Sequence, residues 1–291
     1  MKVAIHGKVL PENTLPVIKH TIDLLRNKNH EFYLSSSFYK QVIERGVALD
    51  SSAIYTPESG LDQFDFVISI GGDGTLLETV THVGKSEIPI LGVNTGRLGF
   101  LATTNKALIS EALESIENNQ FAIDTRMLLK VDSSESIFDD LNYGLNEVTV
   151  LKQDTSSMIT VHSYINGEFL NSYWADGLII ATPTGSTGYS LSCGGPVVMP
   201  HSNNLILTPV SPHNLNVRPL VVSDSCTISL EVESRSGYFM VSLDSRSRTI
   251  KSGLKLQIRK EGFSAKLIKF DGYSFVNTLR KKLNWGLDVR N

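Results

Sequence analysis

The first 120 residues alternate between short apolar runs and longer segments whose apolar positions recur every three or four residues. This alternation predicts strands over 2–7, 31–35, 64–70 and 88–93, and helices over 14–27 and 106–118. The run Phe64–Ile70 is almost wholly apolar, which is typical of a strand covered on both faces of a parallel sheet. We therefore expect an α/β domain with an open, mostly parallel sheet over residues 1–123.

From about residue 124 onward, strand-like runs follow one another without helical periods between them. Asn166-Gly167 separates the runs 158–165 and 168–174, and this dipeptide favours a two-residue hairpin turn. Further strands are predicted over 178–181, 205–208, 219–222, 226–232, 238–243, 254–259 and 265–269. These runs predict an all-β domain over 124–269. The tail, 270–291, regains a helical pattern over 274–283 and is expected to pack back on the first domain.

Composition excludes several classes of protein. Apolar residues make up 41 % and charged residues 20 %, which is ordinary for a globular chain and argues against disorder. Lys and Arg number 27 against 30 Asp and Glu, a net charge of −3, so we expect no nucleic-acid partner. Only Cys193 and Cys226 occur, too few for a zinc ribbon, and no apolar run is long enough for a membrane helix. We expect a cytoplasmic protein without a membrane partner.

The first candidate for chemistry is the turn Gly71–Thr75, directly after the buried strand. A strand, a glycine turn and a helix together direct backbone N–H groups and a positive helix end at the sheet edge, which suits phosphate. The dinucleotide fingerprint is absent, because Leu77 stands where that motif needs glycine. Asp73 is an acid among glycines, so it must do something other than bind an anion. Turn formation and helix capping explain the same residues equally well.

Three further polar segments favour a functional role for this turn over a purely structural one. Asn94–Leu101 would bring a second glycine turn to the same sheet edge, or its Phe100 and Leu101 simply fill a domain junction. Asn146-Glu147 precedes an apolar run, and a solvated strand entry explains this pair when it is considered alone. The segment 176–192 offers many N–H and hydroxyl donors, and an aromatic ring able to lie against a base. Packing alone would need far fewer of those donors.

These segments together resemble the NAD kinases. The matching blocks are GGDGT at 71–75, NTGRLGFL at 94–101, NE at 146–147, DGLIIATPTGSTGYSLSCGGP at 176–196 and, in support, LTPVSPHNLNVRPLVV at 207–222. GGDGT alone is also similar to lipid and sphingosine kinases and, more distantly, to phosphofructokinases. The set of blocks in this order is specific.

The resemblance implies that the γ-phosphoryl group of ATP passes to the 2′-hydroxyl of the adenosine ribose of NAD, which makes NADP. It implies that Asp73 is the general base, with the phosphate loop formed by Gly71, Gly72, Gly74 and Thr75. Asn146 and Glu147 would fix the adenosine ribose, and Asp176 would lie on the nicotinamide riboside side. The other NAD-binding residues that the resemblance implies, besides Asp73 and Gly74, are Thr184, Thr187, Gly188, Tyr189, Ser190, Leu191, Ser192 and Ser211.

The resemblance also implies Mg²⁺ or another divalent cation, for which no residue pattern identifies protein ligands, and a homodimer or homotetramer formed through the β domain. Gly188 stands where the family commonly has alanine, and Trp174 where relatives often carry a basic residue. Leu243–Arg246 replaces the more usual Asp-Gly-Gln, which makes Arg246 a substitute cation or a plain surface charge. We assign structural roles to His213 and Arg218.

Two other functions compete with the kinase. One is a catalytically silent sensor that binds NAD or NADP, although this chain keeps Asp73 and the glycines that such a module would lose. The other is a lipid or sphingosine kinase sharing only GGDGT, which leaves 146–147 and 176–192 unexplained.

Overall fold

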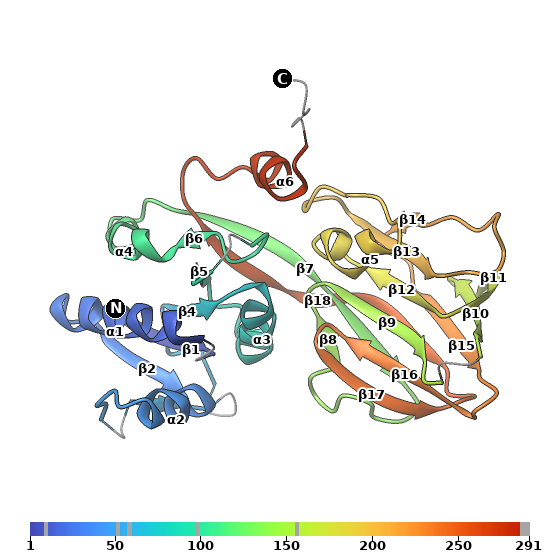
Figure 1. Ribbon diagram of the computed structural model, residues 1–291, viewed down its shortest axis with the longest axis horizontal. Helices are drawn as coiled ribbons and strands as arrows, with labels where there is room; N and C mark the ends of the chain where they lie inside the picture. The colour runs from blue at the N-terminus through green and yellow to red at the C-terminus, as the bar shows by residue number, and fades with distance from the viewer. Residues whose placement is uncertain (9–10, 51–52, 57–59, 97–98, 155–156, 286–291) are drawn as a thin grey trace. The chain divides into compact units, whose positions relative to one another are not determined.

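The computed structural model describes residues 1–8, 11–50, 53–56, 60–96, 99–154 and 157–285. The chain forms two compact units (Figure 1). Unit 1 comprises Met1–Thr125 together with Ala265–Asn291, and unit 2 comprises Arg126–Ser264. The chain therefore leaves unit 1 once and returns to it once.

Unit 1 is built on a parallel sheet. Its strands are β1 (Lys2–Gly7), β2 (Glu31–Ser35), β3 (Ile54–Tyr55), β4 (Phe66–Gly71), β5 (Ile90–Asn94), the short β6 (Thr104–Asn105) and the end of β18 (Leu256–Lys269). The order is β18-β5-β4-β1-β2-β3, with β6 pairing with β5. Gly71 pairs with Asn94 at the carboxyl ends of β4 and β5, so the loops that follow these strands begin side by side.

Helices cover this sheet, and several of them bury an apolar face in its core. The helices are α1 (Pro11–Asn27), α2 (Ser36–Glu44), α3 (Asp73–Val83), α4 (Ile109–Glu117) and α6 (Phe275–Leu283). Residues four apart, such as Ile18 and Ile22 of α1 or Phe38 and Val42 of α2, are buried in one core with Ile5. On α6, Leu279 is buried and the ring of Phe275 lies 6.2 Å from that of Phe100. The prediction that the tail packs back on the first domain is confirmed.

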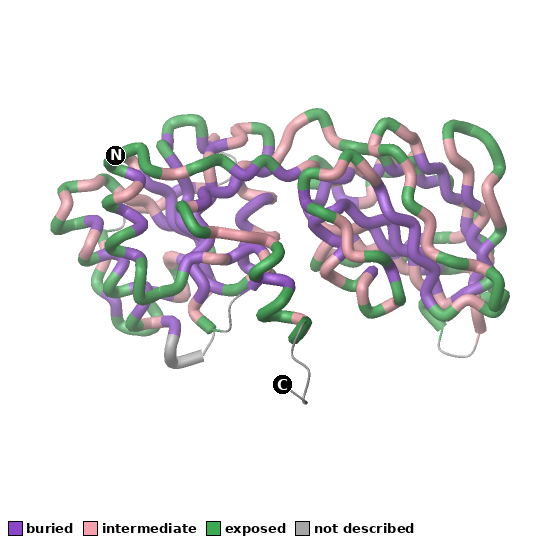
Figure 2. The backbone as a smooth tube through the Cα atoms, turned by 90° about the horizontal axis from the view of Figure 1, so that it is seen from above, coloured by how far each residue is buried: buried purple, intermediate pink, exposed green. Residues whose placement is uncertain are grey.

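Unit 2 is a sandwich of two antiparallel sheets. One contains β7 (Ala122–Ser133), β8 (Tyr143–Gly144), β10 (Ile159–Ile165), β11 (Glu168–Ala175), β15 (Ile228–Glu233) and part of β18. The other has the order β14-β13-β12-β9-β16-β17, with β9 (Glu147–Lys152), β12 (Gly177–Ala181), β13 (Asn204–Val210), β14 (Leu220–Ser223), β16 (Tyr238–Leu243) and β17 (Arg246–Lys251). Alternate residues of both sheets form one core, and the buried backbone follows the strands of each unit (Figure 2).

The predicted fold class, an α/β domain with a mostly parallel sheet and a β domain, is confirmed. The two predicted strands 254–259 and 265–269 are wrong in detail, because β18 runs unbroken through the polar stretch between them. The hairpin turn at Asn166-Gly167 is present, with φ angles of 51° and 86°. Among the described residues, none of the helices combines the length and the apolar character that a membrane span requires.

Candidate active site

The turn Gly71–Thr75 joins β4 to α3 in unit 1. A Cβ at Gly71 would lie 2.2 Å from the hydroxyl oxygen of Thr75, so only glycine allows the strand to bend this tightly onto the helix. A Cβ at Gly72 or Gly74 would meet nothing within 4 Å, which leaves one side of the turn open. The open side lies at the first turn of α3, where backbone N–H groups favour an anion.

The carboxylate of Asp73 is bound by the loop that follows β5. Its Oδ2 accepts the N–H of Phe100 at 2.8 Å, and its Oδ1 accepts those of Leu101 and Ala102 at 3.0 Å each. A Cβ at Gly99 would lie 1.9 Å from Oδ1, so this approach requires glycine. The carboxylate of Asp73 is therefore turned toward the second glycine loop.

That second loop is fastened to the same sheet edge. Thr95 donates its N–H to the carbonyl of Gly71 at 3.1 Å, and the side chain of Asn94 accepts the N–H of Gly96 at 2.7 Å. Asn94 also donates to the carbonyl of Ala102 at 3.3 Å. Arg97 and Leu98 of the NTGRLGFL block lie outside the described residues. The two glycine turns are therefore one hydrogen-bonded structure.

Lys269, at the end of β18, supports this loop from within unit 1. The side chain is only 5 % exposed, and its Nζ donates to the carbonyl of Leu101 at 3.2 Å and to the hydroxyl of Thr103 at 3.0 Å. Its ammonium lies 4.3 Å from the centre of the Tyr273 ring. Sequence reasoning missed Lys269, and the signal was a lysine directly after the apolar pair Leu267-Ile268.

In unit 2, Asn146-Glu147 forms the entry to β9 and is clamped from two sides. The carboxylate of Asp244, in the turn between β16 and β17, accepts the N–H groups of Leu145 and Asn146 at 2.8 Å and that of Glu147 at 3.2 Å. Thr182 donates its N–H to the carbonyl of Asn146 at 2.8 Å and its hydroxyl to that of Leu145 at 2.6 Å. Sequence reasoning named Asp244 only as part of a departure from the family and missed this role.

Glu147 holds an unusual carboxyl group. Its Oε2 is buried and accepts or donates no hydrogen bond among the described residues. Burial, and then the negative charge of Asp244, raise the pKa of Glu147 to about 8. A Cβ at Gly188 would lie 3.1 Å from this oxygen and 3.7 Å from the side-chain amide of Asn146. The Asn146 amide, the Glu147 carboxyl and Gly188 therefore share one small polar notch.

Asp176 lies between β11 and β12. Lys152 forms an ion pair with its carboxylate at 2.6 Å. Tyr189 is 40 % exposed, and its pKa is raised by partial burial, by the neighbouring thiol of Cys193 and by the charge of Asp176. Asp176 and Tyr189 thus belong to one electrostatic neighbourhood.

The hydroxyl groups between β12 and α5 (Tyr189–Ser192) mostly bond to the protein itself. The hydroxyl of Thr182 accepts the N–H of Gly185, and the hydroxyl of Thr184 accepts a hydrogen bond from Arg126. The hydroxyl of Thr187 donates to the carbonyl of Thr184. The hydroxyl of Ser186 donates to the carbonyl of Pro183, and the hydroxyl of Ser190 shares a hydrogen bond with that of Thr208. The expectation that packing needs few of these donors is therefore wrong. Ser192 and Ser211 are exposed, with Ser211 in the left-handed region at φ 46°.

Arg246 and Trp174, which depart from the family's usual residues, both have neighbours in the structure that explain their positions. Arg246 donates to the backbone carbonyls of Leu141 and Tyr143, so it braces the segment before β8. The ring of Trp174 lies 4.3 Å from that of His213, tilted by 39°. Arg218 donates to the carbonyls of Leu215 and Val217 in its own loop. His213 and Arg218 thus make structural contacts.

Comparisons with known proteins point to one family. Sequence models of the ATP-NAD kinase N-terminal domain and C-terminal domain match residues 27–121 and 145–270. The chain is 49 % identical over 292 residues to the NAD kinase of Cytophaga hutchinsonii, with all of both chains covered. It is 42 % identical to that of Bacteroides fragilis, again over all of both chains.

Two solved structures share the fold. Yeast NADH kinase complexed with NADH gives a TM-score of 0.85 at 22 % identity, covering 99 % of this chain and 89 % of that one. An NAD kinase from Archaeoglobus fulgidus in complex with ATP gives 0.75 at 27 % identity, covering 98 % and 99 %. With both domain models matched and full-length relatives at such identity, this chain belongs to the NAD kinase family.

Proposed function

We propose that this protein is an ATP-dependent NAD kinase, which transfers the γ-phosphoryl group of ATP to the 2′-hydroxyl of the adenosine ribose of NAD. The bond from the γ-phosphorus to the bridging oxygen of ATP breaks, and a bond from that phosphorus to the ribose oxygen forms. The products are ADP and NADP, and the hydroxyl proton passes to a base. Full-length relatives named NAD kinase support this reaction.

Unit 1 is proposed to bind the donor phosphates at the turn Gly71–Thr75. The open side of Gly72 and Gly74 and the first turn of α3 support this assignment, since they offer space and backbone donors together. ATP would enter as its magnesium complex. The described residues at this turn supply no cluster of carboxylates, which fits an ion held mainly through the phosphates rather than by a protein cage.

Asp73 is proposed to be the general base. A carboxylate has about four acceptor positions, and backbone N–H groups occupy three of those on Asp73, so room for one hydroxyl donor remains. The three N–H groups also hold the carboxylate still, which general-base catalysis requires. Removing its basicity is expected to lower turnover by about 10²- to 10⁴-fold.

Unit 2 is proposed to bind NAD. The observation that carries this step is the buried Oε2 of Glu147, which has no hydrogen-bond partner in the described part of the chain and lies next to the Asn146 amide and the bare backbone of Gly188. A ribose has two neighbouring hydroxyl groups, each of which can donate and accept a hydrogen bond. A protonated carboxyl and a side-chain amide can form hydrogen bonds of both kinds with them. Asp176 would serve the nicotinamide riboside. The remaining contacts are assigned to Thr184, Thr187, Tyr189, Ser190, Leu191, Ser192 and Ser211.

The decisive experiment measures NADP formation by the purified full chain from NAD, ATP and magnesium. The variant Asp73→Asn should bind NAD as the wild type does and lose most turnover. Asp62→Asn, in an exposed turn of unit 1, is the matched control and should be fully active. NAD binding without NADP formation by the wild type would instead indicate a sensor, and normal turnover by Asp73→Asn would remove that residue from the mechanism.

We also propose a cellular location and an oligomeric state for the protein. The free thiols of Cys193 and Cys226 support a reducing, cytoplasmic location. Exposed apolar side chains on unit 2, among them Leu215 at 82 % and Phe169 at 57 % exposure, support a homo-oligomer formed through the β sandwich. Light scattering on the purified chain would give its mass, and a monomer would contradict the second proposal.

A further inference from the structure

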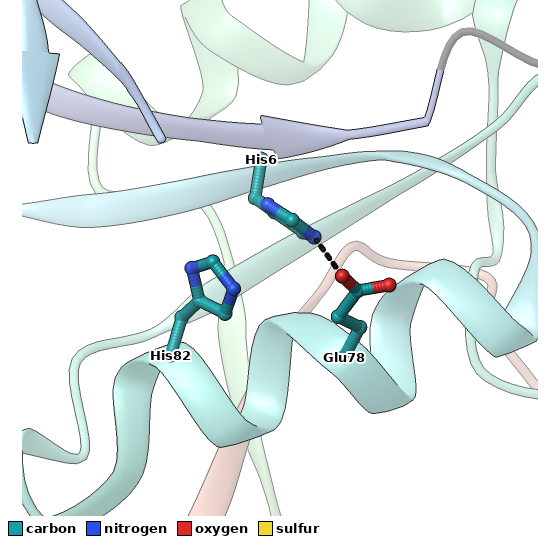
Figure 3. Close-up of side chains that lie close together, drawn as sticks. All are labelled: His6, Glu78 and His82. Atoms are coloured by element: carbon teal, nitrogen blue, oxygen red, sulfur yellow. Dashed lines mark ion pairs between the residues drawn. The ribbon is translucent and has the colours of Figure 1, made fainter. Parts of the chain in front are cut away.

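Three side chains converge between β1 and α3, in a part of unit 1 that the proposed reaction does not use. His6 projects from β1, and Glu78 and His82, which are four positions apart, face it from the same side of α3 (Figure 3). One ligand atom from each of the three lies within 4.8 Å of the other two. The ring centres of His6 and His82 are 4.1 Å apart.

His6 is prepared to act as a ligand. It is only 1 % exposed, and its Nδ1 shares a hydrogen bond with the hydroxyl of Ser35 at 2.8 Å. Its Nε2 has no hydrogen-bond partner among the described residues and points at Glu78, whose Oε1 is 3.7 Å away, beyond hydrogen-bond distance. When Nδ1 donates to Ser35, Nε2 presents its lone pair. A buried nitrogen that has no hydrogen-bond partner needs an explanation, and a bound ion between His6 and Glu78 would supply one.

Glu78 divides its two oxygens between two neighbours. Lys8 pairs with Oε2 at 2.6 Å, while Oε1 faces His6. A carboxylate oriented by a cation on one oxygen can use the other as a single ligand. Lys8 and Ser35 thus hold Glu78 and His6 from behind, as the outer contacts of metal ligands do.

We propose that His6, Glu78 and His82 bind one divalent transition-metal ion of the zinc class, with a further coordination position left for water. Two imidazole nitrogens and one carboxylate oxygen suit Zn²⁺, whereas Mg²⁺ and Ca²⁺ prefer oxygen alone. In a tetrahedral zinc site with bonds of about 2.0 to 2.2 Å, two ligand atoms lie about 3.3 to 3.6 Å apart. The three ligand atoms now lie within 4.8 Å of one another, so side-chain rotation would have to draw them together to bind the ion.

The ion would tie β1 to the helix that begins with Asp73. This site is independent of the proposed kinase reaction and its magnesium.

Calorimetric titration of the chelator-treated full chain with Zn²⁺ tests the site. The wild type should bind one equivalent, and His82→Gln and Glu78→Gln should each bind at least tenfold more weakly. His20→Gln, an exposed histidine on α1, is the matched control and should bind as the wild type does. Because His82 is only half-buried, its variant should fold as the wild type does, which circular dichroism would check.

Titration with Co²⁺ adds a spectroscopic test. The visible bands of a nitrogen and oxygen site should appear without the near-ultraviolet thiolate absorption that Cys193 or Cys226 would give. No binding by the wild type, equal binding by His82→Gln, or a thiolate signature would each overturn the proposal.

Discussion

Asp244 accepts the backbone N–H of Glu147 at 3.2 Å although 97 residues separate the two in the chain. The same carboxylate takes the N–H groups of Leu145 and Asn146. One acid thus shapes the backbone of the notch and, through its charge, helps to raise the pKa of the Glu147 carboxyl above it.

Replacing Asp244 with alanine should therefore damage both stability and NAD binding. Three backbone donors would lose their acceptor, and we expect a loss of about 3 kcal/mol in the free energy of unfolding. Denaturant unfolding and the KM for NAD measure the two effects. Asp140→Ala, an exposed acid in the same unit, is the control. An unchanged KM in folded Asp244→Ala would contradict the positioning role.

The pKa of Glu147 predicts a dependence of stability on pH. The folded state keeps a proton on this carboxyl up to about pH 8, while the unfolded chain releases it near 4.5. The contribution of Glu147 is thus fully present below pH 4.5 and is lost as the pH rises through 8. Over this window the melting temperature of the ligand-free wild type should fall relative to that of Glu147→Gln. Parallel curves for the two proteins would refute the assignment.

Two glycines in the same turn should respond differently to alanine. A Cβ at Gly185 would lie 2.2 Å from the backbone carbonyl of Asn146, and backbone cannot yield, so we expect Gly185→Ala to cost about 3 kcal/mol. A Cβ at Gly188 would lie 3.1 Å from the Glu147 side chain and 3.2 Å from the carbonyl oxygen of Gly185, contacts that shifts of a few tenths of an ångström relieve. Gly188→Ala should keep its stability and change chiefly the KM for NAD. The reverse order of stabilities would show that the notch is arranged differently.

Lys269→Met should separate turnover from NAD binding. The variant keeps the length of the buried side chain but leaves the Leu101 carbonyl without the ammonium donor, so the loop on Asp73 loses its support. We expect kcat to fall about tenfold or more with little change in the KM for NAD. Lys266→Met, at a more exposed position of the same strand, is the control. Equal kcat values in the two variants would exclude a role for Lys269 in positioning.

Local chemistry explains which parts of the fold were predictable. The turn at Asn166-Gly167 depends on those two residues alone, and the strand before Gly71 depends on its own apolar run. α2 was missed because its serine-rich start resembles a loop, although Phe38 and Val42 carry the helical spacing. β18 was divided in two because its middle is polar, while its ends pair with β15 and with β5.

The candidate site follows the same rule. Asp73, Asn146 and Glu147 stand in the short segments that carry the resemblance to the family, so their sequence alone marks them as candidates. Asp244 and Lys269 act through backbone groups 97 or more residues away, and no local pattern encodes such contacts. The acceptance of three N–H groups by Asp73 belongs to this second kind, since its donors lie 27 to 29 residues further along.

The return of the chain to unit 1 at Ala265 has a consequence for how the protein can be dissected. Unit 2 is one uninterrupted stretch, so it can be excised and expressed as a fragment, whereas the parallel-sheet unit is discontinuous in the gene and is finished only when its last strand has been translated. A ribosome therefore completes the sandwich before the sheet whose edge leads into Asp73, and premature stop codons after residue 264 should yield a folded sandwich joined to an unfinished partner.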